Sequence, residues 1–114
     1  MPFINSKISI KITPEQETEL KSRLGEAISM IPGKSENWLM VCFEPEAHLY
    51  FRGDNSEAVV FVDVSIYGSE NPSAFSSLTG EICTIYHEVM NIQPDHVYVK
   101  YSVTNNWGWN GSNF

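Results

Sequence analysis

The stretch VVFVDVSIY, residues 59–67, is the part of the sequence that most strongly specifies a fold. It is rich in β-branched residues, which favour strands. Apolar residues recur at every second position, and in a strand every second side chain lies on the same face. The stretch therefore predicts a long strand with one face in a hydrophobic layer. That face consists of Val60, Val62, Val64 and Ile66.

An amphipathic helix is predicted just after this strand. Asparagine is a good helix cap and proline suits the first helical position, so Asn71-Pro72 indicates a helix start. Gln93-Pro94-Asp95 breaks the helix, and residues 96–103 alternate as a final strand. The apolar stripe of the helix consists of Phe75, Leu78, Ile82, Ile85, Tyr86 and Val89.

The first half of the chain repeats this plan. Residues 3–12 predict a strand, and Thr13-Pro14 indicates a capped helix start 58 residues before Asn71-Pro72. Residues 38–43 form a nearly continuous apolar run, which is typical of a buried central strand, and residues 48–52 predict a short strand. The first helix has the apolar stripe Leu20, Leu24, Ala27, Ile28 and Ile31 and ends at Pro32-Gly33.

Two successive β-α-β units predict an α+β fold made by a single domain, residues 1–114. We expect a two-layer sandwich in which both helices cover one face of a mixed four-stranded sheet. The other face stays bare, and we expect its residues to be apolar or aromatic. Because no third helix is available to cover it, we infer that another subunit packs on it.

Composition excludes several classes of protein. Fourteen acidic residues stand against seven basic ones, giving a net charge of −7, so neither nucleic acid nor an anionic membrane is an expected partner. No apolar run approaches the roughly 20 residues of a membrane span. No signal peptide is recognised, so a cytoplasmic location is expected. The histidines and cysteines lack metal-ligand spacing, so no metal or cofactor is expected.

Pro2 is the first residue with distinctive chemistry. Removal of Met1 would expose its secondary amine, and a free α-amino group has a pKa of about 7.7–8.0. Burial and a nearby cation lower such a pKa, which would make the amine a general base near neutral pH. Lys34 is a candidate for that cation. Composition alone favours the interpretation that Pro2 follows Met1 by chance, and Lys34 also fits a cation that only complements a helix C-terminus.

Tyr98 and Lys100 lie two residues apart in the last predicted strand and so point to the same side. His96 and Ser102 share that side, which is therefore polar. A strand edge that faces solvent would show the same pattern.

Taken together, these features resemble the tautomerase superfamily, in its macrophage migration inhibitory factor and D-dopachrome tautomerase branch. The resemblance covers essentially the whole chain. It rests on Met1-Pro2, on Gly33-Lys34 followed by Trp38, and on the motifs SIYG at 65–68, PDHVYV at 94–99 and GWNGSNF at 108–114.

The resemblance implies a homotrimer whose sheets enclose a channel, with sites between neighbouring subunits. It implies that Pro2 is the catalytic base, that Lys34 and the Ile66 backbone bind a substrate carboxylate, and that Tyr98 comes from the adjacent subunit. Lys100 replaces an asparagine of the family cytokine, and we expect it to meet Lys34 beside Pro2. The remaining pocket residues implied are Phe3, Trp38, Trp107, Trp109 and Phe114.

The function implied is a cofactor-free keto–enol tautomerase, an isomerase of the phenylpyruvate or dopachrome type, acting on a small aromatic α-keto acid. An alternative is a cytokine-like signalling protein that binds a receptor, and a third is a binding module without catalysis. Export without a signal peptide is known in the family, so secretion stays open. The CxxC motif of the family cytokine is absent, so thiol-redox activity is not expected.

Overall fold

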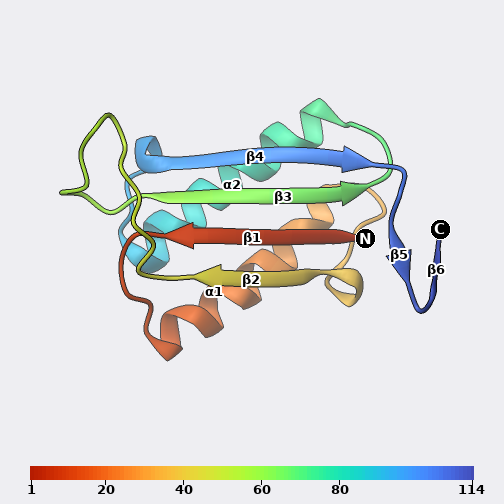
Figure 1. Ribbon diagram of the computed structural model, residues 1–114, viewed down its shortest axis with the longest axis horizontal. Helices are drawn as coiled ribbons and strands as arrows, with labels where there is room; N and C mark the ends of the chain where they lie inside the picture. The colour runs from red at the N-terminus through yellow and green to blue at the C-terminus, as the bar shows by residue number, and fades with distance from the viewer.

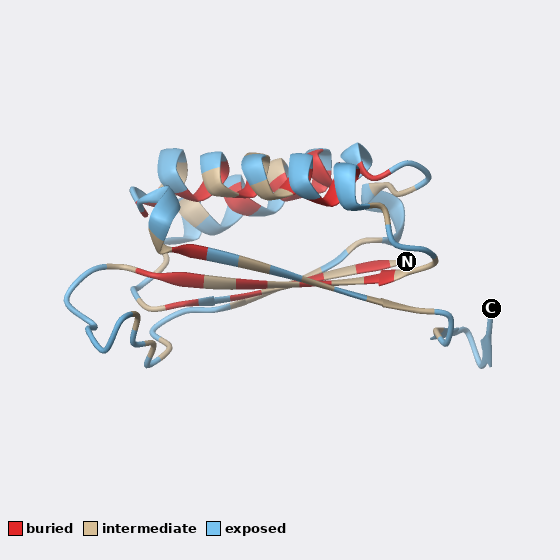
Figure 2. Cartoon of the chain, turned by 90° about the horizontal axis from the view of Figure 1, so that it is seen from above, coloured by how far each residue is buried: buried red, intermediate tan, exposed pale blue.

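The computed structural model describes residues 1–114. Its four-stranded sheet has the order β2-β1-β3-β4, and two helices lie across one face of it (Figures 1 and 2). β1 is parallel to β2 and antiparallel to β3, while β3 is parallel to β4, so the sheet is mixed as predicted. The elements are β1 (Pro2–Ile8), α1 (Pro14–Ala27), β2 (Met40–Glu44), β3 (Val60–Tyr67), α2 (Pro72–Met90) and β4 (Val97–Thr104).

Both helices begin with the predicted cap and proline. In α1 the Thr13 hydroxyl accepts from the Gln16 backbone N–H at 3.1 Å, and the Gln16 side chain accepts from the Thr13 N–H at 3.0 Å. In α2 the Asn71 side chain accepts from the Ala74 N–H at 3.2 Å. Such caps each stabilise a helix by about 1 kcal/mol. They fix where each helix starts relative to the strand before it.

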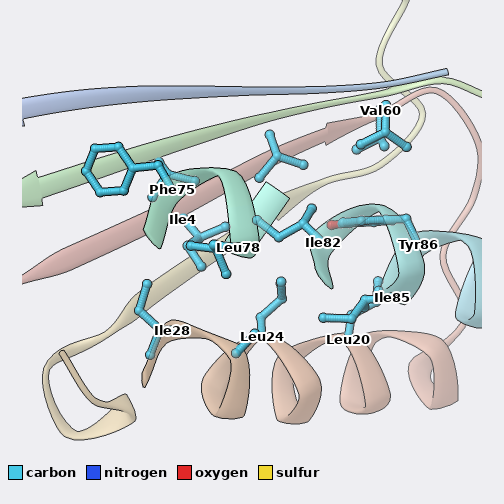
Figure 3. Close-up of a cluster of buried hydrophobic side chains, with 14 of the residues drawn as sticks. Ile4, Leu20, Leu24, Ile28, Val60, Phe75, Leu78, Ile82, Ile85 and Tyr86 are labelled. Atoms are coloured by element: carbon cyan, nitrogen blue, oxygen red, sulfur yellow. The ribbon is translucent and has the colours of Figure 1, made fainter. Parts of the chain in front are cut away.

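The hydrophobic core lies between the sheet and the two helices (Figure 3). The predicted face of β3 is buried, and it meets the buried face of β1, which carries Ile4 and Ile8. Removing one such side chain, as in leucine to alanine, typically costs about 2–5 kcal/mol. The helices contribute the fully buried Leu20, Leu24, Ile28, Leu78, Ile82, Ile85 and Tyr86.

Of two strand predictions in the middle of the chain, one is right only in part and the other is wrong. The run at 38–43 does contain a strand, β2, but it starts at Met40 after a 3-10 turn (Glu36–Trp38) and lies at an edge of the sheet instead of its buried centre. Met40 is 69% exposed. Residues 48–52 form no strand, since the only pairing there is an isolated bridge between Phe51 and Asp54. The predicted first strand also ends early, at Ile8.

The open face of the sheet is mixed in character, which corrects the expectation of an apolar or aromatic face. The register places Asn5, Asp63 and Lys100 in one row across β1, β3 and β4. The Lys100 ammonium lies 3.4 Å from the Asp63 carboxylate. Aromatic side chains occupy other positions on this face, at Phe3, Phe61 and Tyr98. A face with paired charges at its centre is less apolar than a domain core.

Candidate functional site

Pro2 lies at the end of the sheet where the N-terminus and the C-terminal hairpin meet (Figure 1). It is buried and pairs with Ile66 across β1 and β3. A hollow of about 750 Å³ opens beside it. Among the residues that line this hollow are Phe3, Trp38, Trp107 and Trp109, together with Asn37, Leu39, Met40, Ser65 and Thr104.

The chain-terminal amine sits in an environment that favours its neutral form. The pKa of the Met1 amine is lowered from 8.0 to about 6, first by burial and then by the charge and hydrogen bond of Lys34. Both effects disfavour the ammonium, because it loses water and faces a like charge. An amine at this position is therefore largely unprotonated at neutral pH.

Lys34 is directed to this amine by its local backbone. After α1 the chain turns through Gly33, whose φ of 82° is a left-handed conformation that favours glycine. The Lys34 N–H donates to the Ile31 carbonyl at 3.0 Å, which closes the turn. The Lys34 ammonium then donates to the Tyr67 carbonyl at 2.6 Å, at the end of β3. The lysine is thus tied to the strand that pairs with Pro2.

Tyr67 is the residue that the sequence interpretation missed. Its N–H donates to the Met1 carbonyl at 3.0 Å, and its carbonyl accepts from Lys34. Through its backbone, Tyr67 therefore contacts both Met1, which carries the amine, and the Lys34 ammonium. The motif SIYG contains Tyr67, but the resemblance transfers only Ile66, and no side-chain pattern signals a backbone contact.

Aromatic rings close the outer side of the site. Trp38 and Trp109 meet edge to face with ring centroids 5.2 Å apart, and Trp109 stacks on Phe114 at 6.3 Å. Phe114 in turn lies 5.5 Å from the Tyr67 ring. The short strands β5 (Gly108–Trp109) and β6 (Ser112–Asn113) hold this C-terminal hairpin together. A second hollow of about 270 Å³ is lined by Met1, Gly33, Trp38, Tyr67 and Phe114.

Tyr98 and Lys100 are not brought to Pro2 within one chain. Tyr98 pairs with Phe61, five residues before Ile66 along β3, and five strand residues span about 17 Å. The expected meeting of Lys100 with Lys34 is therefore absent within one chain, where Lys100 faces Asp63. Tyr98 lies toward the opposite end of the sheet, and Lys100 lies in the middle row with Asp63.

A separate cluster surrounds Tyr98 at that opposite end. Its ring meets Phe51 edge to face, with centroids 5.3 Å apart. Phe51 belongs to the loop of residues 45–59, which projects beyond the sheet in Figure 1. The Tyr98 side of the sheet thus carries its own small hollow of about 80 Å³, lined also by His96 and Tyr50.

Two further features bear on the class of protein. No three His, Cys, Asp or Glu side chains are grouped so that they could hold a metal ion. None of the helices has the length and apolar character needed to span a membrane.

The fold has tandem β-α-β units with two helices on one face of a mixed sheet, and the Met1 amine lies beside Lys34 next to the buried Pro2. These features are those of a tautomerase-like α+β protein. The sequence profile described as Macrophage migration inhibitory factor (MIF) matches residues 1–114, and the chain belongs to this family. It is 28% identical over 118 residues to the macrophage migration inhibitory factor of Mus musculus, covering 100% of this chain and 97% of the mouse protein.

Solved structures agree with this assignment. The crystal structure of Leishmania major MIF2 superposes with a TM-score of 0.91 at 27% identity, covering 100% of this chain and 97% of that one. The macrophage migration inhibitory factor homologue of Prochlorococcus marinus superposes with a TM-score of 0.81 at 26% identity, covering 98% of each chain. Members of this family generally form homo-oligomers, and the fold suggests isomerase activity.

Proposed function

We propose that this protein is a keto–enol tautomerase of small aromatic 2-keto acids, in which Pro2 is the general base after Met1 is removed. The observation that carries the proposal is that the amine at this end of the chain, borne here by Met1, has a pKa lowered to about 6 by burial and by Lys34. A base of this kind is neutral at pH 7 and able to accept a proton. The aromatic rings around it suit an aromatic substrate.

The proposed reaction moves one proton. The Pro2 nitrogen takes a proton from the enol oxygen and returns it to the adjacent carbon, so the enol becomes the ketone. In the reverse direction it takes the proton from the carbon next to the carbonyl. The carbonyl of the substrate itself activates that C–H bond, so the proposal requires no cofactor.

The substrate carboxylate would bind at Lys34 and the end of β3. Removal of Met1 takes away the carbonyl that accepts from the Tyr67 N–H, and this donor then lies unpaired next to the Pro2 amine. An ammonium and a free backbone N–H together suit a carboxylate. This geometry favours the Tyr67 N–H over the Ile66 backbone as the second carboxylate contact.

The pocket would be completed by another copy of the chain in a homotrimer. Pro2 and Tyr98 lie toward opposite ends of one sheet, so a Tyr98 that contacts the substrate of Pro2 has to come from a neighbouring subunit. The same neighbouring subunit would also bring Lys100 to this pocket. The family tendency to form homo-oligomers supports this arrangement.

The direct test is phenylpyruvate tautomerisation by Pro2→Gly protein. We expect turnover to fall about 100-fold, the scale of a lost general base. Pro45→Gly, at an exposed loop proline, is the matched control. Mass spectrometry of each preparation establishes whether Met1 has been removed. Unchanged turnover in Pro2→Gly protein, or full turnover in protein that retains Met1, would contradict the proposal.

A second candidate is a cytokine-like role in which the protein binds a receptor. The full-length similarity to the mouse migration inhibitory factor favours it. Receptor binding by Pro2→Gly protein separates the two roles. Receptor binding that persists when turnover is lost supports a signalling role. If receptor binding and turnover are lost together, receptor binding depends on an intact pocket.

A further inference from the structure

His96 holds two carboxylates at once. Its Nδ1 lies 2.8 Å from Asp95 Oδ1, and its Nε2 lies 2.8 Å from Glu57 Oε2. The histidine side chain is 19% exposed. An ionised carboxylate only accepts hydrogen bonds, so both contacts are satisfied together only when both ring nitrogens donate. That form is the charged imidazolium.

These contacts join two separate parts of the chain. Asp95 and His96 belong to the 3-10 turn Pro94–His96, which leads directly into β4. Glu57 belongs to the loop of residues 45–59. The same loop carries Phe51, whose ring lies 5.5 Å from the His96 ring and 5.3 Å from the Tyr98 ring. The ion pairs therefore fasten the loop at the place where Phe51 supports Tyr98.

We propose that His96 is a positioning residue for Tyr98: as an imidazolium it clamps the loop of residues 45–59 to the start of β4 and so holds Phe51 against Tyr98. The inference rests on the proposed function, in which Tyr98 forms a wall of the neighbouring subunit's pocket. The neutral imidazole donates from one nitrogen only, so its formation releases one of the two carboxylates.

The charged groups that face His96 are mostly acidic. Besides Glu57 and Asp95, the charge of His96 acts on Asp54, whose pKa is lowered mainly by hydrogen bonds from Ser56. The pKa of Asp95 is lowered mainly by its hydrogen bond to His96, with a small contribution from Arg52. A cation at position 96 therefore faces Glu57, Asp95 and Asp54, and the clamp depends on that cation.

Opening of the loop can be measured without any substrate of the enzyme. Arg52 is exposed in this loop, so trypsin cleavage after Arg52 reports how often the loop opens. We expect His96→Gln protein to be cleaved about threefold faster than wild type, because ion pairs with exposed partners have modest strength. His96→Arg, a permanent cation, should keep wild-type protection against cleavage after Arg52. His87→Gln, at an exposed histidine of α2, is the control.

Kinetics then separate the clamp from the proposed function. We expect His96→Gln to raise KM for phenylpyruvate about threefold with kcat nearly unchanged, and His96→Arg to restore the wild-type KM. If loop cleavage responds as expected but wild-type protein has no turnover, the clamp stands and the tautomerase proposal fails. If turnover is normal but His96→Gln matches His87→Gln in cleavage and in KM, the clamp is refuted.

Discussion

The two ends of the sheet differ in what they can do alone. At the Pro2 end, Lys34 is held by the Tyr67 carbonyl, and burial together with Lys34 lowers the pKa of the Met1 amine to about 6. At the Tyr98 end, a long loop and an exposed aromatic ring surround a smaller hollow, and Tyr98 is 58% exposed. The first end carries the groups that we propose as base and carboxylate contact, whereas the second carries an exposed aromatic side chain that we propose as a pocket wall.

This difference supports the proposal that one chain carries two separate half-sites. Strand pairing sets them about 17 Å apart, and the sheet cannot bend to bring them together. Because family members generally form homo-oligomers, one copy can supply the wall that another copy lacks. If the two ends meet between copies, variants at each end should affect the same turnover, and variants at the Pro2 end should have the larger effects.

The largest effect is expected from mixing two defective proteins. Pro2→Gly removes the base and Tyr98→Ala removes the wall, and we expect each homo-oligomer to lose most turnover. Co-refolded in equal amounts, random mixed oligomers should recover about a quarter of wild-type phenylpyruvate turnover, because each intact half then meets the other by chance.

Mixing without refolding is the control, since it leaves the oligomers unmixed. If the co-refolded mixture has only the summed turnover of the two separate variants, the two ends do not share a site.

Lys34→Gln should affect the Pro2 end in two ways. KM for phenylpyruvate is expected to rise about tenfold, because a charge-assisted contact to the carboxylate is lost. The pKa of the amine should rise, because a nearby cation has been removed. Steady-state kinetics across pH measure both. A pH profile identical to wild type would show that Lys34 does not act on the amine; Lys21→Gln, an exposed lysine on α1, is the matched control.

The pH dependence of wild-type kcat/KM should reflect the same amine. A proline amine in this setting works only when neutral, so activity is lost as the pH falls through its lowered pKa, toward about tenfold per pH unit below it. The Met1 amine in this setting has a pKa of about 6. A kcat/KM that stays constant from pH 7.5 down to 5 would argue against a titrating base at this end.

Lys100→Asn should have the smallest effect. Lys100 already lies 3.4 Å from Asp63, and its side chain is 56% exposed. Exposed ion pairs contribute less than about 1 kcal/mol, so we expect KM to change by less than about threefold. A tenfold increase in KM would instead indicate that the Tyr98 end contributes charge as well as a wall.

Much of the fold was predictable from local patterns. The period of two in residues 59–67 and the capped starts at Thr13-Pro14 and Asn71-Pro72 each identify an element correctly, because they depend on neighbouring residues only. Residues 38–43 and 48–52 misled the strand prediction. Their apolar side chains serve an edge strand and loop packing, which hydrophobicity alone does not distinguish from a buried strand.

The candidate site was predicted in part. Pro2, Lys34, Trp38, Trp109 and Phe114 do lie around one end of the sheet. The hydrogen bonds of Tyr67 to Met1 and Lys34 were not foreseen, since they are backbone contacts between distant segments. His96 was visible only as a polar residue beside Tyr98, because its two carboxylate contacts depend on where the 45–59 loop returns.

By itself, the sequence determined the two β-α-β units, the helix caps and the faces that become the core, because these follow from spacing along the chain. Only the tertiary structure decided that β2 lies at an edge, that Lys34 reaches the end of β3, and that Pro2 and Tyr98 lie toward opposite ends of one sheet. Strand order and register are set by pairing between distant segments, and local periodicity carries no information about which strands pair.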